Sequence, residues 1–348
     1  MSQSPVTDRP VCVTGASGFV GSHIVHQLLE DGYRVKASVR APDNRDKYAF
    51  LLEMPGADER LELVGGDLLE EGAYDEAVDG CEYVIHTASP YALDVDDPKR
   101  DLVDPAVEGT ENVLRSCSRS EETKKVVLTS SMAAITDEPD SEHVLTEEDW
   151  NEKSSIRRNP YYFSKTMAER RAWAYVEEDD PALDLVVINP FMVIGPAFDE
   201  RLNTSNELFV DLLDGEFPGI IRMTWGFVDV RDVGRAHILA MENDEAQGRY
   251  ICANTTVSME EIVELLNENG YGDYDLPSLN LACGFGDFAV KLFSYTQPKG
   301  TGTYLRTHVG REPRFDHSKI REELVLDFRP IEETLLETVE DLRRWEHV

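Results

Sequence analysis

The segment that most constrains the fold lies near the start of the chain, where an apolar run leads into three evenly spaced glycines. Residues 11–21 read VCVTGASGFVG. Here Gly15 permits a tight turn, Gly18 lets the backbone approach a pyrophosphate, and Gly21 lets a helix pack closely on a strand. A turn that merely needs glycine is the alternative, but the preceding strand and the following amphipathic helix favour phosphate binding. The segment predicts a dinucleotide site with contacts from Gly15, Ser17, Gly18, Phe19, Val20 and Gly21.

The chain up to Gly195 alternates β-branched runs with amphipathic segments of helical length. Strands are predicted over residues 11–14, 34–39, 61–64, 83–87, 125–129 and 185–188. This alternation implies a parallel sheet covered by helices on both faces. The predicted fold class is therefore α/β, with a Rossmann-type doubly wound sheet.

The pattern changes after Gly195. Turn formers and aromatic residues follow, and the chain of 348 residues is long enough for about two domains. We predict an NADP-binding domain over residues 1–195, to which residues 226–253 return. A smaller, discontinuous substrate-binding domain is predicted over residues 196–225 and 254–348.

The end of the second predicted strand indicates which dinucleotide is bound. An NAD site places an acid about 20 residues after the last glycine, to bind the ribose hydroxyls. This sequence has no acid there and has Arg40 instead, which can pair with a 2′-phosphate. Residues 34–47 contain five basic and two acidic residues, although the whole chain carries a net charge of −34. We predict NADP(H) as the cofactor, and a solvated charged loop is the alternative interpretation.

A candidate acid–base pair lies in the sequence YYFSK over residues 161–165. Tyr161 and Lys165 are four positions apart and therefore share one face of a helix. A nearby ammonium stabilises a phenolate and moves the pKa of a tyrosine toward the working range. A core tyrosine beside a surface lysine is the alternative. Beside a nucleotide site, we predict that Tyr161 is the proton donor and Lys165 its partner.

Hydroxyl groups end the predicted strand over residues 125–129. Ligands of open parallel sheets sit beyond the carboxyl ends of the strands, so Ser130 and Ser131 should face the site. One of them can donate a hydrogen bond to the substrate oxygen. A cap on the following segment is the alternative role.

The charge of −34 excludes some classes of partner. Nucleic acid and anionic membrane surfaces both require a basic footprint, which this chain lacks. The scattered acids suggest a solvated carboxylate shell, and we expect adaptation to high salt, with an ordinary acidic protein as the alternative. The five cysteines have no metal-ligand spacing and no secretion signal is visible, so we predict a cytoplasmic protein without a metal.

Taken together, these motifs resemble the extended short-chain dehydrogenase/reductase family, and most closely its dihydroflavonol-reductase-like branch of carbonyl reductases. The matching segments include VCVTGASGFVGSHIV (11–25), VIHTASP (84–90), LTSSMA (128–133), YYFSK (161–165), INPFMVIGP (188–196) and FVDVRDVGRAHI (227–238). The resemblance spans nearly the whole chain.

The resemblance implies roles for individual residues. Asp67 and Leu68 would hold the adenine end, and Arg40 with Lys47 the 2′-phosphate. The serine that matches the family's catalytic serine is Ser131, with Ser130 as second choice. Lys165 would also bind the nicotinamide ribose. Further cofactor contacts would come from Thr87, Ala88, Ser89, Pro190, Val193 and Ser205.

One position departs from the family pattern. Plant flavonoid reductases resemble one another in carrying an asparagine five positions after the catalytic serine, where this chain has Thr136. A general carbonyl reductase is therefore favoured over a flavonoid enzyme. Besides Ser131 and Tyr161, the expected substrate pocket comprises residues that could equally be core: Tyr91, Met132, Ala133, Phe163, Phe198, Leu202, Asn206 and Phe227.

The sequence thus predicts an NADPH-dependent oxidoreductase that reversibly reduces aldehydes or ketones, with a small-molecule substrate and a monomeric or homodimeric state. A nucleotide-sugar epimerase or dehydratase with bound NAD is one alternative, which Arg40 disfavours. A non-catalytic NADP-sensing regulator is another, and the presence of Tyr161 with Lys165 disfavours it.

Overall fold

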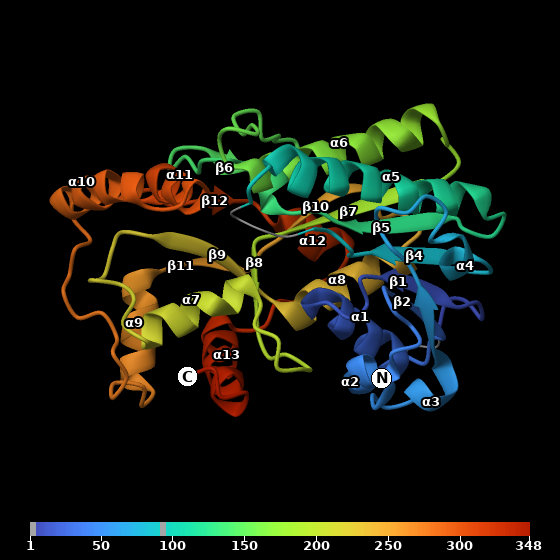
Figure 1. The fold of residues 1–348 in the computed structure, drawn as a ribbon, viewed down its shortest axis with the longest axis horizontal. Coiled ribbons are helices and arrows are strands. Elements are labelled where there is room, and N and C mark those ends of the chain that lie inside the picture. The colour runs from blue at the N-terminus through green and yellow to red at the C-terminus, as the bar shows by residue number, and fades with distance from the viewer. Residues whose placement is uncertain (1–4, 91–94) are drawn as a thin grey trace.

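A seven-stranded parallel sheet forms the centre of the computed structural model, which describes residues 5–90 and 95–348. The strand order is β10-β7-β5-β4-β1-β2-β3 (Figure 1). The strands are β1 (Val11–Thr14), β2 (Val35–Val39), β3 (Leu61–Gly65), β4 (Tyr83–His86), β5 (Lys125–Thr129), β7 (Asp184–Pro190) and β10 (Gly248–Cys252). The predicted α/β fold class is confirmed.

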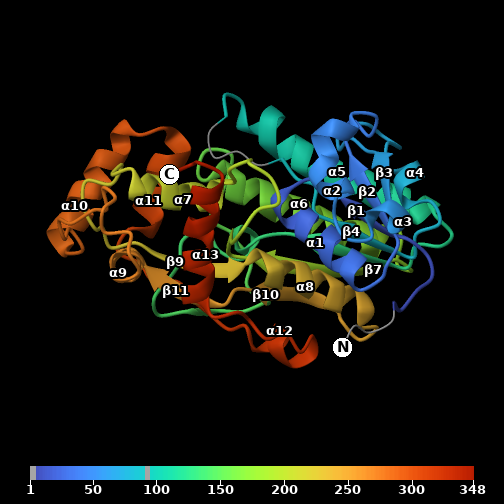
Figure 2. The same ribbon diagram turned by 90° about the horizontal axis from the view of Figure 1, so that it is seen from below.

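Both faces of this sheet are buried, because alternate residues of each strand face opposite helical layers. Val11 and Val13 of β1 join the core that faces α1 (Phe19–Glu30) and α8 (Val230–Glu242). Cys12, between them, joins the core that faces α5 (Asp104–Arg119) and α6 (Pro160–Glu178). Seen from below, α1 and α8 lie side by side against the sheet (Figure 2).

The carboxyl ends of the strands define where a ligand can sit. β1 pairs with β2 on one side and with β4 on the other, and the order of the strands reverses at this point. Ligands of doubly wound sheets bind at such a switch point, beyond the carboxyl ends. The glycine turn of residues 15–18 follows β1 there.

A smaller sheet with the order β11-β9-β8 is formed by strands from the second half of the chain. β8 (Met192–Ile194) pairs in parallel with β9 (Thr224–Asp229), which pairs antiparallel with β11 (Thr255–Ser258). A separate apolar cluster packs around this sheet and includes residues of the helices α7 (Thr204–Leu213), α9 (Met259–Glu268) and α13 (Ile331–Arg344).

The segment 226–253 divides between the two sheets. Its first strand, β9, belongs to the smaller sheet, whereas α8 and β10 belong to the larger body. The division into a cofactor domain and a substrate domain stays a prediction.

The shorter elements connect or cover these two bodies. β6 (Val144–Leu145) pairs with β12 (Arg314–Phe315) in a two-stranded ribbon. The remaining described helices are α2 (Ala49–Leu52), α3 (Ala57–Arg60), α4 (Asp75–Val78), α10 (Gly284–Phe293), α11 (Lys299–His308) and α12 (Ser318–Glu323), with the short helical turns η1 (Arg45–Tyr48), η2 (Lys99–Val103), η3 (Met132–Ala134) and η4 (Ser294–Thr296).

Candidate active site

The glycine turn forms a backbone cradle at the end of β1. Gly15 has a φ of 66°, and a Cβ there would lie 2.7 Å from the backbone nitrogen of Ala88. A Cβ on Gly21 would lie 2.2 Å from the carbonyl oxygen of Gly15. Both positions therefore require glycine.

The helix that follows this turn has free capacity to bind an anion. α1 begins after Gly18, has no acidic residue in its first turn, and receives no capping bond from a side chain in the described structure. The first N–H groups of a helix have no intrahelical acceptors, so those of Phe19 and Val20 can donate to a phosphate beside Ser17. The residues present fit a dinucleotide.

The loop after β4 closes one side of this cradle. Thr87 donates through Oγ1 to the carbonyl oxygen of Thr14 at 2.7 Å, and Ala88 donates through its N–H to Thr14 Oγ1 at 3.3 Å. His86 Nδ1 lies 2.7 Å from the same hydroxyl. Burial lowers the pKa of His86 to about 3, so its ring is neutral. Thr87, Ala88 and Ser89 thus lie where cofactor contacts are predicted.

The residues predicted for the adenosine end follow neighbouring strands. Val39 of β2 pairs with Gly65 of β3, which brings the following Arg40 and Asp67 to one edge of the sheet. Both side chains are exposed. Leu68 accepts a bond from Asn112 through its carbonyl oxygen. Lys47, in η1, is also exposed and places Nζ 5.6 Å from the ring centre of Tyr48.

The predicted acid–base pair lies at the start of α6. Asn159, the residue before the helix, has a φ of 49°, and Pro160 occupies the first helical position, where its missing N–H costs nothing. Tyr161 is half-buried and meets the ring of Tyr162 edge-on, with 5.9 Å between ring centres. Lys165 lies one turn further along and is 8% exposed.

Lys165 points from α6 toward the loop after β4. Its Nζ donates to Ser89 Oγ at 2.9 Å, which joins the helix carrying Tyr161 to the loop that borders Gly15. Burial lowers the pKa of Lys165 to about 8, and the carboxylate of Glu169 opposes that shift. A cavity of about 10 Å³, close to the size that one water needs, has Lys165, Glu169 and Ser130 among its lining residues.

A buried carboxylate, which sequence reasoning missed, organises the far side of Lys165. Glu169 Oε1 accepts from Arg249 Nε at 2.5 Å. Its Oε2 accepts from Ser130 Oγ at 2.5 Å and from Asn189 Nδ2 at 2.8 Å. The spacing of four residues from Lys165 is the only signal in the sequence, because Ser130, Asn189 and Arg249 are distant along the chain and lie in or directly after three different strands.

The two candidate serines have different surroundings. The hydroxyl of Ser130 is committed to Glu169. Ser131 caps η3 by accepting the N–H of Ala133 at 3.1 Å, which leaves its hydroxyl proton for another acceptor. This difference favours Ser131 over Ser130, although its catalytic role stays a prediction.

The structure distributes the remaining predicted contacts widely. Pro190 ends β7, Val193 lies in β8, and Ser205 lies in the first turn of α7. Asn206 is buried and donates to the carbonyl oxygen of Gly195 at 2.9 Å, and the structure gives no partner for its Oδ1. Tyr91 lies outside the described residues.

Several of the expected pocket residues are packed in cores. Phe227 is fully buried against Phe209 and Trp225, and Met132 is buried in a cluster with Ile251. Phe198 packs against the tilted rings of His23 and His26 of α1, with 4.5 and 5.0 Å between ring centres. Other expected pocket residues are Ala133, which is buried, Phe163, which is partly buried, and Leu202, which is 38% exposed.

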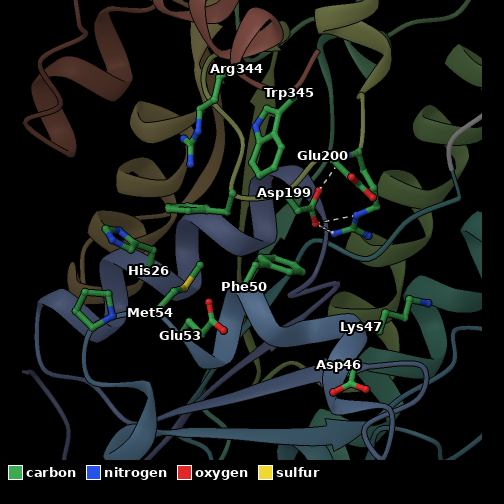
Figure 3. A pocket seen from close by; sticks show the side chains of 13 residues that line it. His26, Asp46, Lys47, Phe50, Glu53, Met54, Asp199, Glu200, Arg344 and Trp345 are labelled. Carbon is green, nitrogen blue, oxygen red and sulfur yellow. Dashed lines mark hydrogen bonds and ion pairs between the residues drawn. The ribbon is translucent and has the colours of Figure 1, made fainter. Parts of the chain in front are cut away.

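A second residue that sequence reasoning missed lies across the glycine turn. Arg201 donates through Nη2 to the carbonyl oxygen of Ser17 at 2.5 Å, although 184 positions separate them. It also borders a hollow of about 800 Å³ beside α1 and α2, in which Phe50, Lys47 and Trp345 are further lining residues (Figure 3). Nothing in the sequence signals this contact.

Two negative findings concern the described part of the chain. It contains no group of three or more His, Cys, Asp or Glu side chains placed to hold a metal ion. None of its helices combines the length and the apolar character needed to cross a membrane.

A parallel sheet with a glycine turn at its switch point, and a Tyr–Lys helix beside it, defines a dinucleotide-binding α/β protein. The chain belongs to the NAD dependent epimerase/dehydratase family, whose model matches residues 11–253. It is an NAD(P)-dependent oxidoreductase of the extended short-chain dehydrogenase/reductase type, so the resemblance seen in the sequence is confirmed.

Three similar proteins illustrate this relationship. Cinnamoyl-CoA reductase CAD2 of Medicago truncatula is 40% identical over 340 residues, which cover 96% of this chain and 95% of that protein. Tetraketide alpha-pyrone reductase 1 of Arabidopsis thaliana is 43% identical over 265 residues, covering 74% and 80%. The crystal structure of yeast methylglyoxal/isovaleraldehyde reductase Gre2 complexed with NADPH superposes with a TM-score of 0.80 at 29% identity, covering 97% of this chain and all of that chain.

Proposed function

We propose that this protein is an NADPH-dependent reductase of aldehydes or ketones in which Tyr161 donates the proton. The observation that carries the proposal is the position of Lys165. This buried residue lies one helical turn after Tyr161, and its Nζ donates a hydrogen bond to Ser89, in the loop that borders the glycine turn. Burial of an ammonium group away from water costs free energy, so such a group is buried only where it has a partner or a function.

The chain's own residues divide the work as follows. NADPH, when bound, supplies a hydride to the carbonyl carbon. Tyr161 donates a proton to the carbonyl oxygen, while the Ser131 hydroxyl donates a hydrogen bond to the same oxygen and stabilises its developing charge. Lys165, as an ammonium, favours the phenolate of Tyr161 and lowers the cost of releasing its proton.

Two observations support NADP(H) rather than NAD. Arg40 occupies the position at which an NAD site carries an acid, and the exposed Lys47 follows it in η1. The similar yeast structure holds NADPH. We therefore assign the 2′-phosphate to Arg40 and Lys47.

The names of the relatives support carbonyl reduction. The two curated relatives are a cinnamoyl-CoA reductase and a tetraketide alpha-pyrone reductase, and the yeast protein is named for two aldehydes. Reductases of thioester, ketone and aldehyde carbonyl groups all need the same hydride and proton delivery. We propose aldehyde or ketone reduction because it needs only this hydride and this proton, and because the yeast protein is named for aldehyde substrates.

The experiment that tests the proposal follows NADPH absorbance with the purified full chain over a panel of aldehydes, diketones, aryl ketones and flavonoids. We expect consumption of NADPH with at least one aldehyde or ketone, and little with NADH. A parallel assay offers UDP-sugars with NAD. Turnover of a sugar nucleotide without any carbonyl reduction would overturn the proposal in favour of an epimerase or dehydratase.

A further inference from the structure

Arg201 lies directly over the phosphate-binding turn. Its guanidinium donates to the carbonyl oxygen of Ser17, which stands between Gly15 and Gly18. The carbon at the centre of the guanidinium lies 5.4 Å from the ring centre of Phe50, on α2. The side chain is 53% exposed, so it can move without unpacking a core.

The loop that carries Arg201 is fixed at both ends. The carbonyl oxygen of Pro196 lies 2.8 Å from Nε2 of His23, and the N–H of Ala197 donates to Asp341 at 2.7 Å. Asn203 caps α7 at the other end. These anchors hold the loop in place, and they therefore fix the position of Arg201 over the turn.

Arg201 lies beside a positive helix end and is paired with a single carboxylate. The first turn of α1 carries the positive end of the helix dipole, and the structure shows no acid in that turn. A cation placed against this positive end is unfavourable unless a negative group accompanies it. Asp199 supplies that group, since Arg201 Nε donates to Asp199 Oδ2 at 2.8 Å.

We propose that Arg201 binds the diphosphate of the dinucleotide and that Asp199 is the counterion it leaves when the diphosphate arrives. The inference rests on the proposed function and adds a cofactor-binding residue to it. A guanidinium offers five donors in a planar fork that matches phosphate oxygens, and a diphosphate carries two negative charges against the single charge of Asp199. The glycine turn presents its N–H groups on the same side.

The experiment measures cofactor binding by the apo full chain without substrate, from protein fluorescence and by calorimetry. Two probes are used: NADPH, and 2′-AMP, which carries the 2′-phosphate and no diphosphate. We expect Arg201→Gln to weaken NADPH binding by about tenfold and to leave 2′-AMP binding unchanged. Arg40→Gln should weaken both. Arg321→Gln, the same change at an exposed arginine of α12, serves as the matched control.

A second variant tests the role of Asp199 with the opposite sign. Asp199→Asn removes the competing charge, so NADPH binding should tighten by about threefold. If the Asp199–Arg201 ion pair only holds the loop in place, Asp199→Asn should instead weaken NADPH binding, as Arg201→Gln does. That result overturns the inference, as does an equal loss of NADPH and 2′-AMP binding or no loss at all in Arg201→Gln. Failure of the wild-type chain to bind NADPH overturns the proposed function as well.

Discussion

Glu169 and Arg249 form an ion pair of 2.5 Å in the interior of the protein, with side chains 0% and 6% exposed. The pair joins α6, which carries Tyr161 and Lys165, to β10 at the edge of the sheet. The second oxygen of Glu169 accepts the hydroxyl of Ser130. The carboxylate therefore accepts the hydroxyl of one of the two candidate serines while it holds the helix that carries Tyr161 and Lys165.

The serines can be separated by substitution. We expect Ser131→Ala to lower kcat by about 10²-fold or more, because it removes a donor to the developing oxyanion. Ser130→Ala should lower the free energy of unfolding by about 1–3 kcal/mol, because Glu169 loses a buried partner, and should retain more activity. Steady-state kinetics and urea unfolding measure the two effects. A larger kcat loss in Ser130→Ala would reverse the assignment.

Removal of the buried carboxylate should be costly. Glu169→Gln leaves the Arg249 guanidinium buried without a counterion, and we expect the free energy of unfolding to fall by about 3–5 kcal/mol. The double variant Glu169→Gln with Arg249→Met should recover part of this loss, since no charge is then stranded. Urea unfolding of the three proteins gives the comparison. Equal stabilities of the single and double variants would contradict the importance of the stranded charge.

The stability of the protein should depend on pH through Lys165. Burial lowers its pKa from 10.5 in an unfolded chain to about 8, so between these values the unfolded state binds more protons than the folded one. The free energy of unfolding of the wild type, relative to Lys165→Met, should therefore rise by about 3 kcal/mol from pH 8 to 10.5. Urea unfolding across this range is the measurement, with Lys291→Met on α10 as the control substitution. A constant difference would show that Lys165 titrates normally.

The proton donor is tested by Tyr161→Phe. This variant should fold and bind NADPH as the wild type does, because only the phenol oxygen is lost. We expect turnover to fall by about 10²–10⁴-fold. Retention of more than about a tenth of the wild-type rate would overturn the role of Tyr161. NADPH titration of the same preparation controls for loss of the cofactor site.

The net charge of −34 predicts a response to salt. Repulsion within a carboxylate shell is screened by counterions, so the unfolding midpoint should rise between low and molar KCl. Thermal unfolding at several KCl concentrations is the measurement, and an uncharged osmolyte at equal osmolality separates screening from exclusion effects. Midpoints that stay level or fall would contradict adaptation to high salt.

Local signals in the sequence account for most of the sheet. Each predicted strand of the first half overlaps an observed one, because buried parallel strands are continuous β-branched runs, and the span predicted as residues 125–129 coincides with β5. The separation of β9 from β10 could not be read in this way. Both are short apolar strands, and only pairing partners elsewhere in the chain decide which sheet each one joins.

In the candidate site, too, local features could be predicted from the sequence and contacts between distant residues could not. The Tyr161–Lys165 pair is visible in the sequence because helical spacing places both on one face. The bond from Lys165 to Ser89 and the bond from Arg201 to Ser17 join residues 76 and 184 positions apart. Such contacts depend on the path of the chain, which neither composition nor periodicity encodes.

The contacts of Glu169 also have a consequence for how the protein is made. Its partners Ser130, Asn189 and Arg249 emerge from the ribosome at widely spaced times, and Arg249 is the last. Until Arg249 has been synthesised, the Glu169 carboxylate lacks the arginine that is its ion-pair partner in the finished protein. The surroundings of Tyr161 and Lys165, although both residues come before residue 170, therefore reach their final form only when more than two thirds of the chain has been synthesised.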